Sequence, residues 1–243
     1  MKIKQMAFEA LFMLIMVLAA ACGDKYNIAG LGDDATSGVK IRFTNACSNC
    51  PSVNIKVGGK IITGVGVAFN GGFPALGYTT FPAGDVNFEF VRADSGQTLS
   101  AGKITGTDGK YFTVFLNDTV PTPINFVVQD DVYGAKEDTM ARIRFVHGLS
   151  GKVKDTLELV RKIDSKVIYS GITFSQATPF GHLNQGNTPD TFFIRKSGST
   201  TAYPGTASVI STWAKGRTYT IYSKGITGKT GTQLPGLNVH TNR

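Results

Sequence analysis

An internal repeat spans most of this chain and limits the folds that it can adopt. Residues 39–45 (VKIRFTN) and 141–147 (ARIRFVH) share one order of apolar, basic, apolar, basic and aromatic side chains. Further segments match in the same order, at a residue offset that stays between 102 and 107 and reaches about 113 only at the last pair. These pairs are 53–57 with 156–160, 66–69 with 171–174, 78–84 with 180–186, 109–115 with 216–222, and 124–128 with 237–240. So steady an offset predicts duplication of a whole domain with small loop insertions.

The segments within each copy have the pattern of β-strands. Apolar and polar residues alternate, as in residues 41–43 and 88–90, which places every second side chain on one face of a sheet. Such segments recur roughly every ten residues, with turn-forming residues between them. This spacing is typical of a β-sandwich or barrel, and we find no helical period longer than about two turns beyond the N-terminal region. We therefore expect an all-β protein with two tandem antiparallel β-sandwich domains.

The N-terminal region has the features of a signal peptide. Lys2 and Lys4 give it a positive start, and an apolar stretch ends in three alanines just before Cys22. The pattern is similar to the lipobox of bacterial lipoproteins, in which a peptidase cleaves before a cysteine that carries diacylglycerol. The apolar stretch is too short to span a bilayer comfortably. We expect residues 1–21 to be removed and Cys22 to anchor the mature chain in a membrane through lipid; an ordinary secretory signal that leaves Cys22 unmodified is the alternative.

The remaining chain divides into a tether and two domains. Residues 22–38 are rich in glycine and aspartate and predict a flexible tether. The first domain is expected at 39–129 and the second at 141–243, with a short polar linker at 130–140. In that linker Asp130 and the aspartate after it are expected to be solvated. The two domains are expected to behave as beads with a limited hinge.

The charge balance of the chain is basic. The formal net charge is +8, and removal of the signal peptide would take away two lysines and one glutamate, which leaves +7. A basic balance can indicate nucleic acid as a partner. Here the basic residues are scattered, with no run denser than Arg161-Lys162 or Arg195-Lys196. We therefore expect a solvated basic surface and no binding of nucleic acid.

Cys47 and Cys50 form a C-x-x-C pair after the first strand segment. Such a pair can be a redox dithiol or half of a zinc site. A zinc site would need two further ligands, and His147, His182 and His240 lie in the second domain at unrelated spacing. In an oxidising envelope the favoured interpretation is a small disulfide that fixes the loop, with an active dithiol as the alternative. We expect no metal site.

The sequence contains no recognisable catalytic motif. His147 ends a strand, where a structural hydrogen bond is favoured over general-base catalysis, and no serine or aspartate has an elbow or triad context. Trp213, the only tryptophan, and Tyr78 are candidates for contact with a ligand, although packing in a core is the competing interpretation for both. We therefore expect neither an enzyme nor a cofactor.

Two threonines are candidate modification sites. Asp118-Thr119-Val120 and Asp138-Thr139-Met140 are similar to the D-T-hydrophobic sites at which Bacteroidetes envelope proteins are O-glycosylated. Both fall in predicted loop or linker positions, where a sugar could be accepted. Thr119 and Thr139 are therefore candidate O-glycosylation sites.

The paired opening strands, the FPAG turn at 81–84 and the KYFTV segment after it resemble the domain-of-unknown-function 4397 family. Domains of that family begin with an R-h-R-F/V-h-H/N strand, where h is apolar, and end with a Y-T-V/I strand. Asn45 occupies the H/N position in the first copy and His147 in the second, which has Phe180 in place of a tyrosine. The resemblance covers nearly all of residues 39–243. It implies an immunoglobulin-like sandwich found in bacterial cell-envelope lipoproteins, often of the Bacteroidetes type, and brings no established activity.

These observations together predict a non-enzymatic, lipid-anchored protein of the bacterial outer membrane. We expect a binding or scaffold module that recognises an envelope protein or a glycan, on either face of that membrane. A structural accessory subunit of an outer-membrane complex is the alternative. A hydrolase with a site built from loops is a third, less favoured class.

Overall fold

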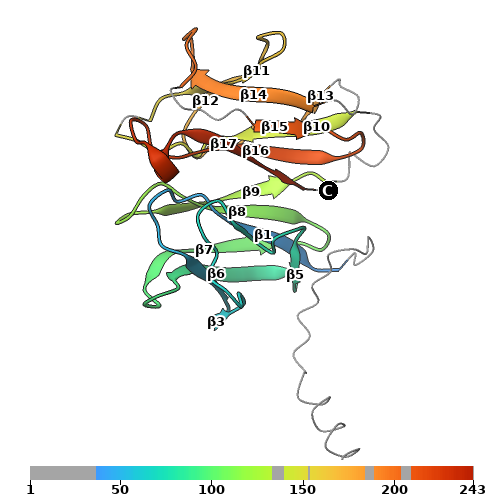
Figure 1. Ribbon diagram of the computed structural model, residues 1–243. Helices are drawn as coiled ribbons and strands as arrows, with labels where there is room; N and C mark the ends of the chain where they lie inside the picture. Colours follow the sequence, from blue (N-terminus) through green and yellow to red (C-terminus); the bar gives the residue numbers. More distant parts are fainter. Residues whose placement is uncertain (1–36, 133–139, 153, 184–188, 204–208, 243) are drawn as a thin grey trace, which may run out of the picture.

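The computed structural model describes residues 37–132, 140–152, 154–183, 189–203 and 209–242. Within these ranges the chain forms β-strands and one short 3₁₀ helix, η2 at Gly231–Gln233 (Figure 1). The prediction of an all-β protein is confirmed. Among the residues so described, no helix is long and apolar enough to cross a membrane. The predicted signal peptide, Cys22 and Thr139 lie outside the described residues.

The first half of the molecule contains two sheets. Its strands are β1 (Val39–Asn45), β2 (Val53–Val57), β3 (Lys60–Ile61), β4 (Gly72–Phe73), β5 (Thr79–Phe81), β6 (Gly84–Arg92), β7 (Thr98–Gly106), β8 (Tyr111–Asn117) and β9 (Ile124–Asp130). One sheet has the order β4-β1-β8-β9, with β5 also paired to β1, and the other has the order β3-β2-β6-β7. The predicted linker begins one residue too early, because Asp130 is the last residue of β9.

The second half repeats this arrangement. Its strands are β10 (Ala141–Val146), β11 (Leu157–Arg161), β12 (Val167–Ile172), β13 (Gly181–Leu183), β14 (Pro189–Lys196), β15 (Val209–Thr212), β16 (Thr218–Lys224) and β17 (Gly236–Thr241). One sheet has the order β13-β10-β16-β17 and the other has the order β12-β11-β14-β15. The first of these orders matches β5-β1-β8-β9 strand for strand, as the internal repeat in the sequence leads one to expect.

Strand pairing is antiparallel with one exception in each half. Strand β1 pairs parallel with β8, with Arg42 opposite Thr113, and β10 pairs parallel with β16, with Arg144 opposite Thr220. The prediction of purely antiparallel sheets is therefore wrong at these two positions. The reason is topological: β1 and β8 are separated by a passage of the chain through the other sheet, so no hairpin forces them to run in opposite directions.

Each half encloses one apolar core between its two sheets. Alternate residues of β1, namely Val39, Ile41 and Phe43, are fully buried in the first core, and Phe43 packs edge-on against Phe88 at 5.7 Å between ring centroids. Alternate residues of β10 and β16 contribute in the same way to the second core, where Trp213 is fully buried. Burial of apolar area of this kind is the main favourable contribution to folding.

The two halves pack against each other through the opposite faces of these same sheets (Figure 1). We call this contact the junction: it lies between the sheet of β1, β8 and β9 and the sheet of β10, β16 and β17. Its apolar part contains Phe115, Tyr222 and Val146, with the smaller Ala46 beside them. All residues of β1 and β10 are buried because each strand is covered on both faces. The expectation of two beads with a limited hinge is therefore wrong.

Replacement of Trp213 by alanine tests the packing of the second core. We expect Trp213→Ala to lower the free energy of unfolding by about 3–5 kcal/mol, because truncating a large buried aromatic side chain leaves a cavity. Equilibrium denaturation with urea measures this change. The matched control is Ile163→Ala, since the Ile163 side chain is 75% exposed and its truncation should have little effect. Equal stabilities of the two variants would contradict the core position of Trp213.

Candidate functional site

A closed ring of hydrogen bonds crosses the junction; we call it the polar ring. The carboxylate of Asp130 accepts a hydrogen bond from the Tyr78 hydroxyl at 2.7 Å and forms an ion pair with the Arg144 guanidinium. The Arg144 Nε donates to the Thr220 hydroxyl at 2.9 Å. That hydroxyl donates to Asn242 Oδ1 at 2.7 Å, and the Asn242 amide donates back to the Tyr78 hydroxyl at 2.8 Å. Two members come from the first half and three from the second.

The polar ring is buried, and its hydrogen bonds account for that burial. Asp130 is 4% exposed and Arg144 1% exposed, so both charges are removed from water. A buried charge is tolerated only when it is paired and its remaining donors or acceptors are used. Asp130 also accepts from the Thr113 hydroxyl at 2.6 Å, and Arg144 donates to the Gln129 carbonyl at 3.1 Å. Burial, together with the negative charge of Asp130, raises the pKa of Tyr78 well above its usual value.

Two histidines are buried as neutral rings. His147 Nε2 lies 2.9 Å from the Asp155 carbonyl, and its Nδ1 accepts from the Leu149 amide at 3.3 Å. Burial lowers the pKa of His147 from 6.5 to about 4. The ring of His240 packs beside the rings of Phe115 and Tyr222 at the junction. Burial, and then the charges of nearby arginines, hold the pKa of His240 well below 6.5.

A cleft of about 720 Å³ opens where loops of the two halves meet. The first half lines it with residues 48–50 and 68–70, and the second half lines it with Lys224 and residues 231–236. Lys224 is the last residue of β16, and Gly236 is the first residue of β17, with which it pairs. The cleft therefore lies at one end of the junction and depends on how the halves are held together.

The wall from the first half is fixed by a short cross-linked loop. Cys47 and Cys50 form a disulfide, with 5.3 Å between their Cα atoms. Between them, the Ser48 hydroxyl accepts a hydrogen bond from the Gly225 amide of the second half at 3.0 Å. The Asn49 side chain accepts from the Val120 amide at 2.8 Å. The disulfide thus constrains the loop that contacts the opposite wall.

The wall from the second half depends on a glycine. Gly225 has φ of +95°, a conformation that other residues rarely adopt, and a Cβ atom there would clash with the Leu234 carbonyl oxygen. The chain then turns through η2, where the Ile226 amide donates to the Gln233 carbonyl at 2.8 Å. Next to this turn the Lys224 ammonium lies 5.7 Å from the centroid of the Phe69 ring. Partial burial lowers the pKa of Lys224.

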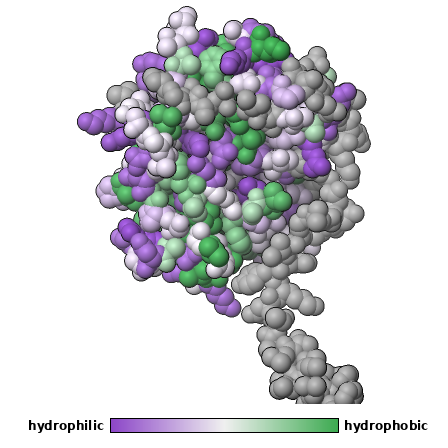
Figure 2. All heavy atoms as spheres, in the orientation of Figure 1, coloured by the Kyte–Doolittle hydropathy of each residue, from purple (hydrophilic) through white to green (hydrophobic). Residues whose placement is uncertain are grey.

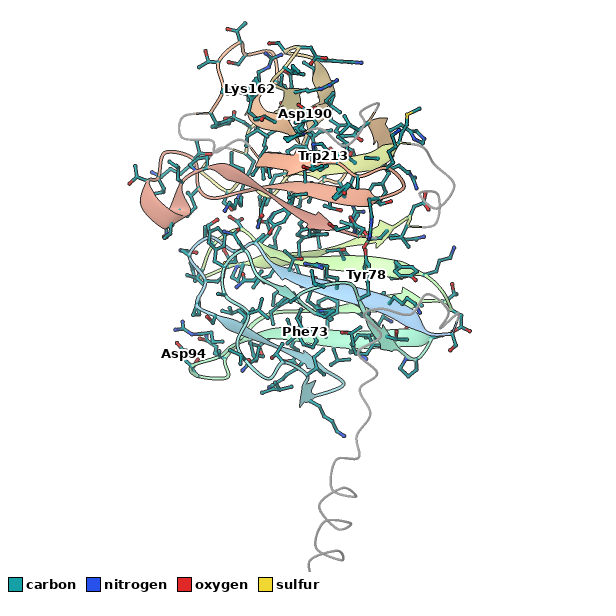
Figure 3. The ribbon with its side chains drawn as sticks, turned by 45° about the vertical axis from the view of Figure 1, so that its right-hand side comes forward. Phe73, Tyr78, Asp94, Lys162, Asp190 and Trp213 are labelled. Carbon is teal, nitrogen blue, oxygen red and sulfur yellow. A yellow bond between two sulfur atoms is a disulfide. The ribbon has the colours of Figure 1, made fainter. Side chains whose placement is uncertain are left out.

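Of the candidate site residues that the structure describes, only Cys50 lines this cleft. Trp213 is fully buried against Phe192 and Tyr219, and Tyr78 is 6% exposed within the polar ring (Figure 3). Neither ring presents a face to a ligand, so their packing and hydrogen bonding replace the expected ligand contacts. Thr119 lies half-buried in the loop between β8 and β9. Within the described ranges no three histidine, cysteine, aspartate or glutamate residues are grouped as a metal site would require.

Sequence reasoning missed both Asp130 and the cleft. The polar residues after Asp130 predict a solvated linker there, although the alternation of inward residues Phe126 and Val128 continues to Asp130 and places it on the buried face of β9. The cleft is formed by loops whose mutual contacts leave no periodic signal. The recurrence of arginine at positions 42 and 144 was noted as a strand pattern, but not as a sign of a shared buried face.

Comparison with known proteins adds one match. Residues 39–154 match the family model described as Domain of unknown function (DUF4397). The matched region begins at β1 and includes the whole first half, β10 and part of the loop that follows β10. A comparison with curated proteins finds no match. The match supports the resemblance found in the first copy and assigns no chemistry to the cleft.

Removal of one charge from the polar ring tests its contribution to stability. We expect Asp130→Asn to lower the free energy of unfolding by about 3–5 kcal/mol, because Arg144 would remain buried without a counter-charge. Chemical denaturation at neutral pH measures the loss. In the control Asp85→Asn, the ion pair with Lys103 lies on the exposed surface, where such pairs contribute little. A stability of Asp130→Asn equal to that of the control would refute the importance of the ring.

The two buried histidines predict that stability falls as the pH is lowered from 7 to 5. The folded-state pKa of His147 is about 4 instead of 6.5, so in this range the unfolded chain binds protons that the folded chain does not bind. The double variant His147→Asn, His240→Phe should show a smaller fall. Asn45 at the corresponding position of the first half accepts an equivalent hydrogen bond from the Cys47 amide. Urea midpoints measured across this range would disprove the idea if the wild-type protein were equally stable at both ends.

Proposed function

We propose that this protein is a non-enzymatic binding or scaffold module of a bacterial cell envelope. It is held at the outer membrane by lipid on Cys22 and recognises a protein or a glycan. The N-terminal pattern that is similar to a lipobox supports the anchor. The composition of residues 22–38, which predicts a tether, fits a folded part that stands clear of lipid head groups.

Within this proposal the two halves are tandem immunoglobulin-like β-sandwich domains. Three observations support this: each half has two sheets around its own core, the strand orders correspond, and the sequence repeat follows the same order. The family match to residues 39–154 extends beyond the first half into β10. Such sandwiches bind their partners largely through loops at the ends of the strands.

The observation that carries the proposal is the cleft between the halves. Its volume of about 720 Å³ falls in the range of about 300–1,000 Å³ usual for ligand sites. Its two walls come from different halves, and the Ser48 hydroxyl and the Gly225 amide connect them. Because the junction is packed and hydrogen-bonded, the walls are held in place before any ligand arrives. Such pre-organisation reduces the entropic cost of binding.

Enzymatic activity has less support. The rings of His147 and His240 are buried and neutral, and His147 already uses both nitrogens in hydrogen bonds. These observations do not favour a general base at either position. A hydrolase built from loops therefore remains the least favoured class.

A structural accessory subunit is the second candidate, and exposed apolar side chains favour it. Val65 is 85% exposed and Leu76 is 82% exposed, both in loops of the first half. Large exposed apolar residues can form contacts with another protein when they gather in a patch. On the face shown in Figure 2, however, hydrophobic and hydrophilic residues are intermixed over both halves. We therefore place recognition at the cleft first.

Purification of the native lipidated protein tests the proposed function. The protein is extracted in gentle detergent, and mass spectrometry identifies its N-terminal peptide and any stoichiometric partner. We expect a diacylated Cys22, a specific envelope partner or bound glycan, and loss of membrane association in Cys22→Ser. A protein that is recovered alone from several extractions would contradict the scaffold role. An unmodified Cys22 would contradict the anchor.

A further inference from the structure

The repeat provides an internal comparison for the cleft. Phe69 and Phe174 occupy corresponding positions in the two copies, and a lysine ammonium lies near each ring. The Lys154 Nζ lies 3.8 Å from the centroid of Phe174 and 2.8 Å from Asp118 Oδ1. At Phe69, by contrast, Lys224 has no carboxylate of the described residues within ion-pair distance.

The missing carboxylate has a definite place in the chain. Thr113 of β8 pairs with Arg42, and Thr220 of β16 pairs with Arg144, so the two threonines are corresponding residues. Asp118 lies five residues after Thr113, and the residue at the same place after Thr220 is Gly225. A Cβ atom on Gly225 would clash with the Leu234 carbonyl, so no side chain fits at this position. The second half therefore cannot supply to the site at Phe69 the carboxylate that Asp118 of the first half supplies to the site at Phe174.

The rest of the cleft does not supply a negative charge either. Among the described residues that line it, Lys224 is the single charged side chain, and the others are neutral: Ser48, Asn49, Cys50, Ala68, Phe69, Asn70, Gly231, Thr232, Gln233, Leu234, Pro235 and Gly236. A half-buried ammonium without an anionic partner loses hydration and gains no compensating ion pair. A single lysine, with no arginine among the described lining residues, suits one carboxylate better than a doubly charged phosphate.

The neutral side chains indicate what kind of molecule carries that carboxylate. Asn70, Gln233 and Thr232 offer amide and hydroxyl groups that can both donate and accept hydrogen bonds. Phe69 and Leu234 offer apolar surfaces to the C–H groups of a ring. Of the described residues that line the cleft, only Lys224 and Gly236 belong to strands, so the cleft presents no length of strand edge along which an extended peptide could add.

We infer that the cleft binds an acidic sugar whose carboxylate pairs with Lys224, whose hydroxyls bind the neighbouring amides and whose ring lies against Phe69. This inference rests on the proposed binding function and specifies its ligand class. The ligand supplies in the second half the same group that Asp118 supplies at the corresponding place in the other copy.

Calorimetric titration of the mature chain with an oligogalacturonate tests the inference, with an uncharged galactose oligomer of the same length as the comparison. We expect the acidic oligomer to bind and the uncharged one to bind at least about tenfold more weakly. Lys224→Met should weaken binding of the acidic oligomer by about tenfold or more, whereas Lys224→Arg should largely preserve it. The control Lys154→Met removes the lysine that is already paired with Asp118 and should leave binding unchanged. The thermal midpoint of each variant shows that it is folded.

Three results would overturn the inference: equal affinity for the two oligomers, unchanged binding in Lys224→Met, or binding of an acidic peptide in preference to the acidic sugar. Purification of native Lys224→Met separates this failure from failure of the proposed function. If neither oligomer binds but an envelope partner still co-purifies with Lys224→Met, the ligand class is wrong and the binding function stands. If neither oligomer nor partner is found with the wild-type protein, both proposals fail.

Discussion

The ion pair between Asp130 and Arg144 joins the last strand of the first half to the first strand of the second, and the relative position of the halves depends on it. Both charges are removed from water, and each must remain within reach of its partner to avoid a large desolvation penalty. The hydroxyl and amide groups of the polar ring use the remaining hydrogen-bonding capacity and link the two facing sheets. Because the ring closes on itself, displacement of one sheet along the other would break several hydrogen bonds together. The two walls of the cleft at the end of the junction are therefore also held in a fixed relative position.

The two halves correspond closely, and the places where they differ are informative. In the apolar part of the junction Phe115 and Tyr222 are equivalent residues that meet with ring centroids 5.6 Å apart. Beyond this part the correspondence ends: the loop at one side is closed by Lys154 and Asp118, and the other side remains open around Lys224. The junction thus has two similar corners, of which one is closed by an ion pair between Lys154 and Asp118 and the other is an accessible cleft.

Much of the local structure could be predicted from the sequence. The alternation at 39–45 and 141–147 identified β1 and β10, and the steady offset of the repeat anticipated that the two halves share their strand order. These features depend on neighbouring residues, so a short stretch of sequence is sufficient to reveal them. The predicted spacing also located β8 and β16 near their observed positions.

The contact between the halves could not be predicted in the same way. The basic residues of β1 and β10 alternate with apolar ones, a pattern that predicts one solvent-exposed face for each strand. In the structure that face is covered by the other half. The sequence does not distinguish a solvated arginine or aspartate from a buried one. Which of the two environments it has depends on a partner that is distant in the sequence. Asp130, Tyr78 and Asn242 are separated by long stretches of chain, and the parallel pairing of β1 with β8 depends on a similarly distant contact.

The face-to-face arrangement of the sheets also determines how many such halves can associate by this contact. Each half contributes corresponding strands, β1-β8-β9 and β10-β16-β17, so the contact is isologous, like that of a symmetric dimer. An isologous contact is complete with two members, and neither half retains an equivalent free face. A third copy in a longer chain would need either a different surface or a fourth copy with which to pair. Longer chains built on this contact would therefore contain an even number of such copies.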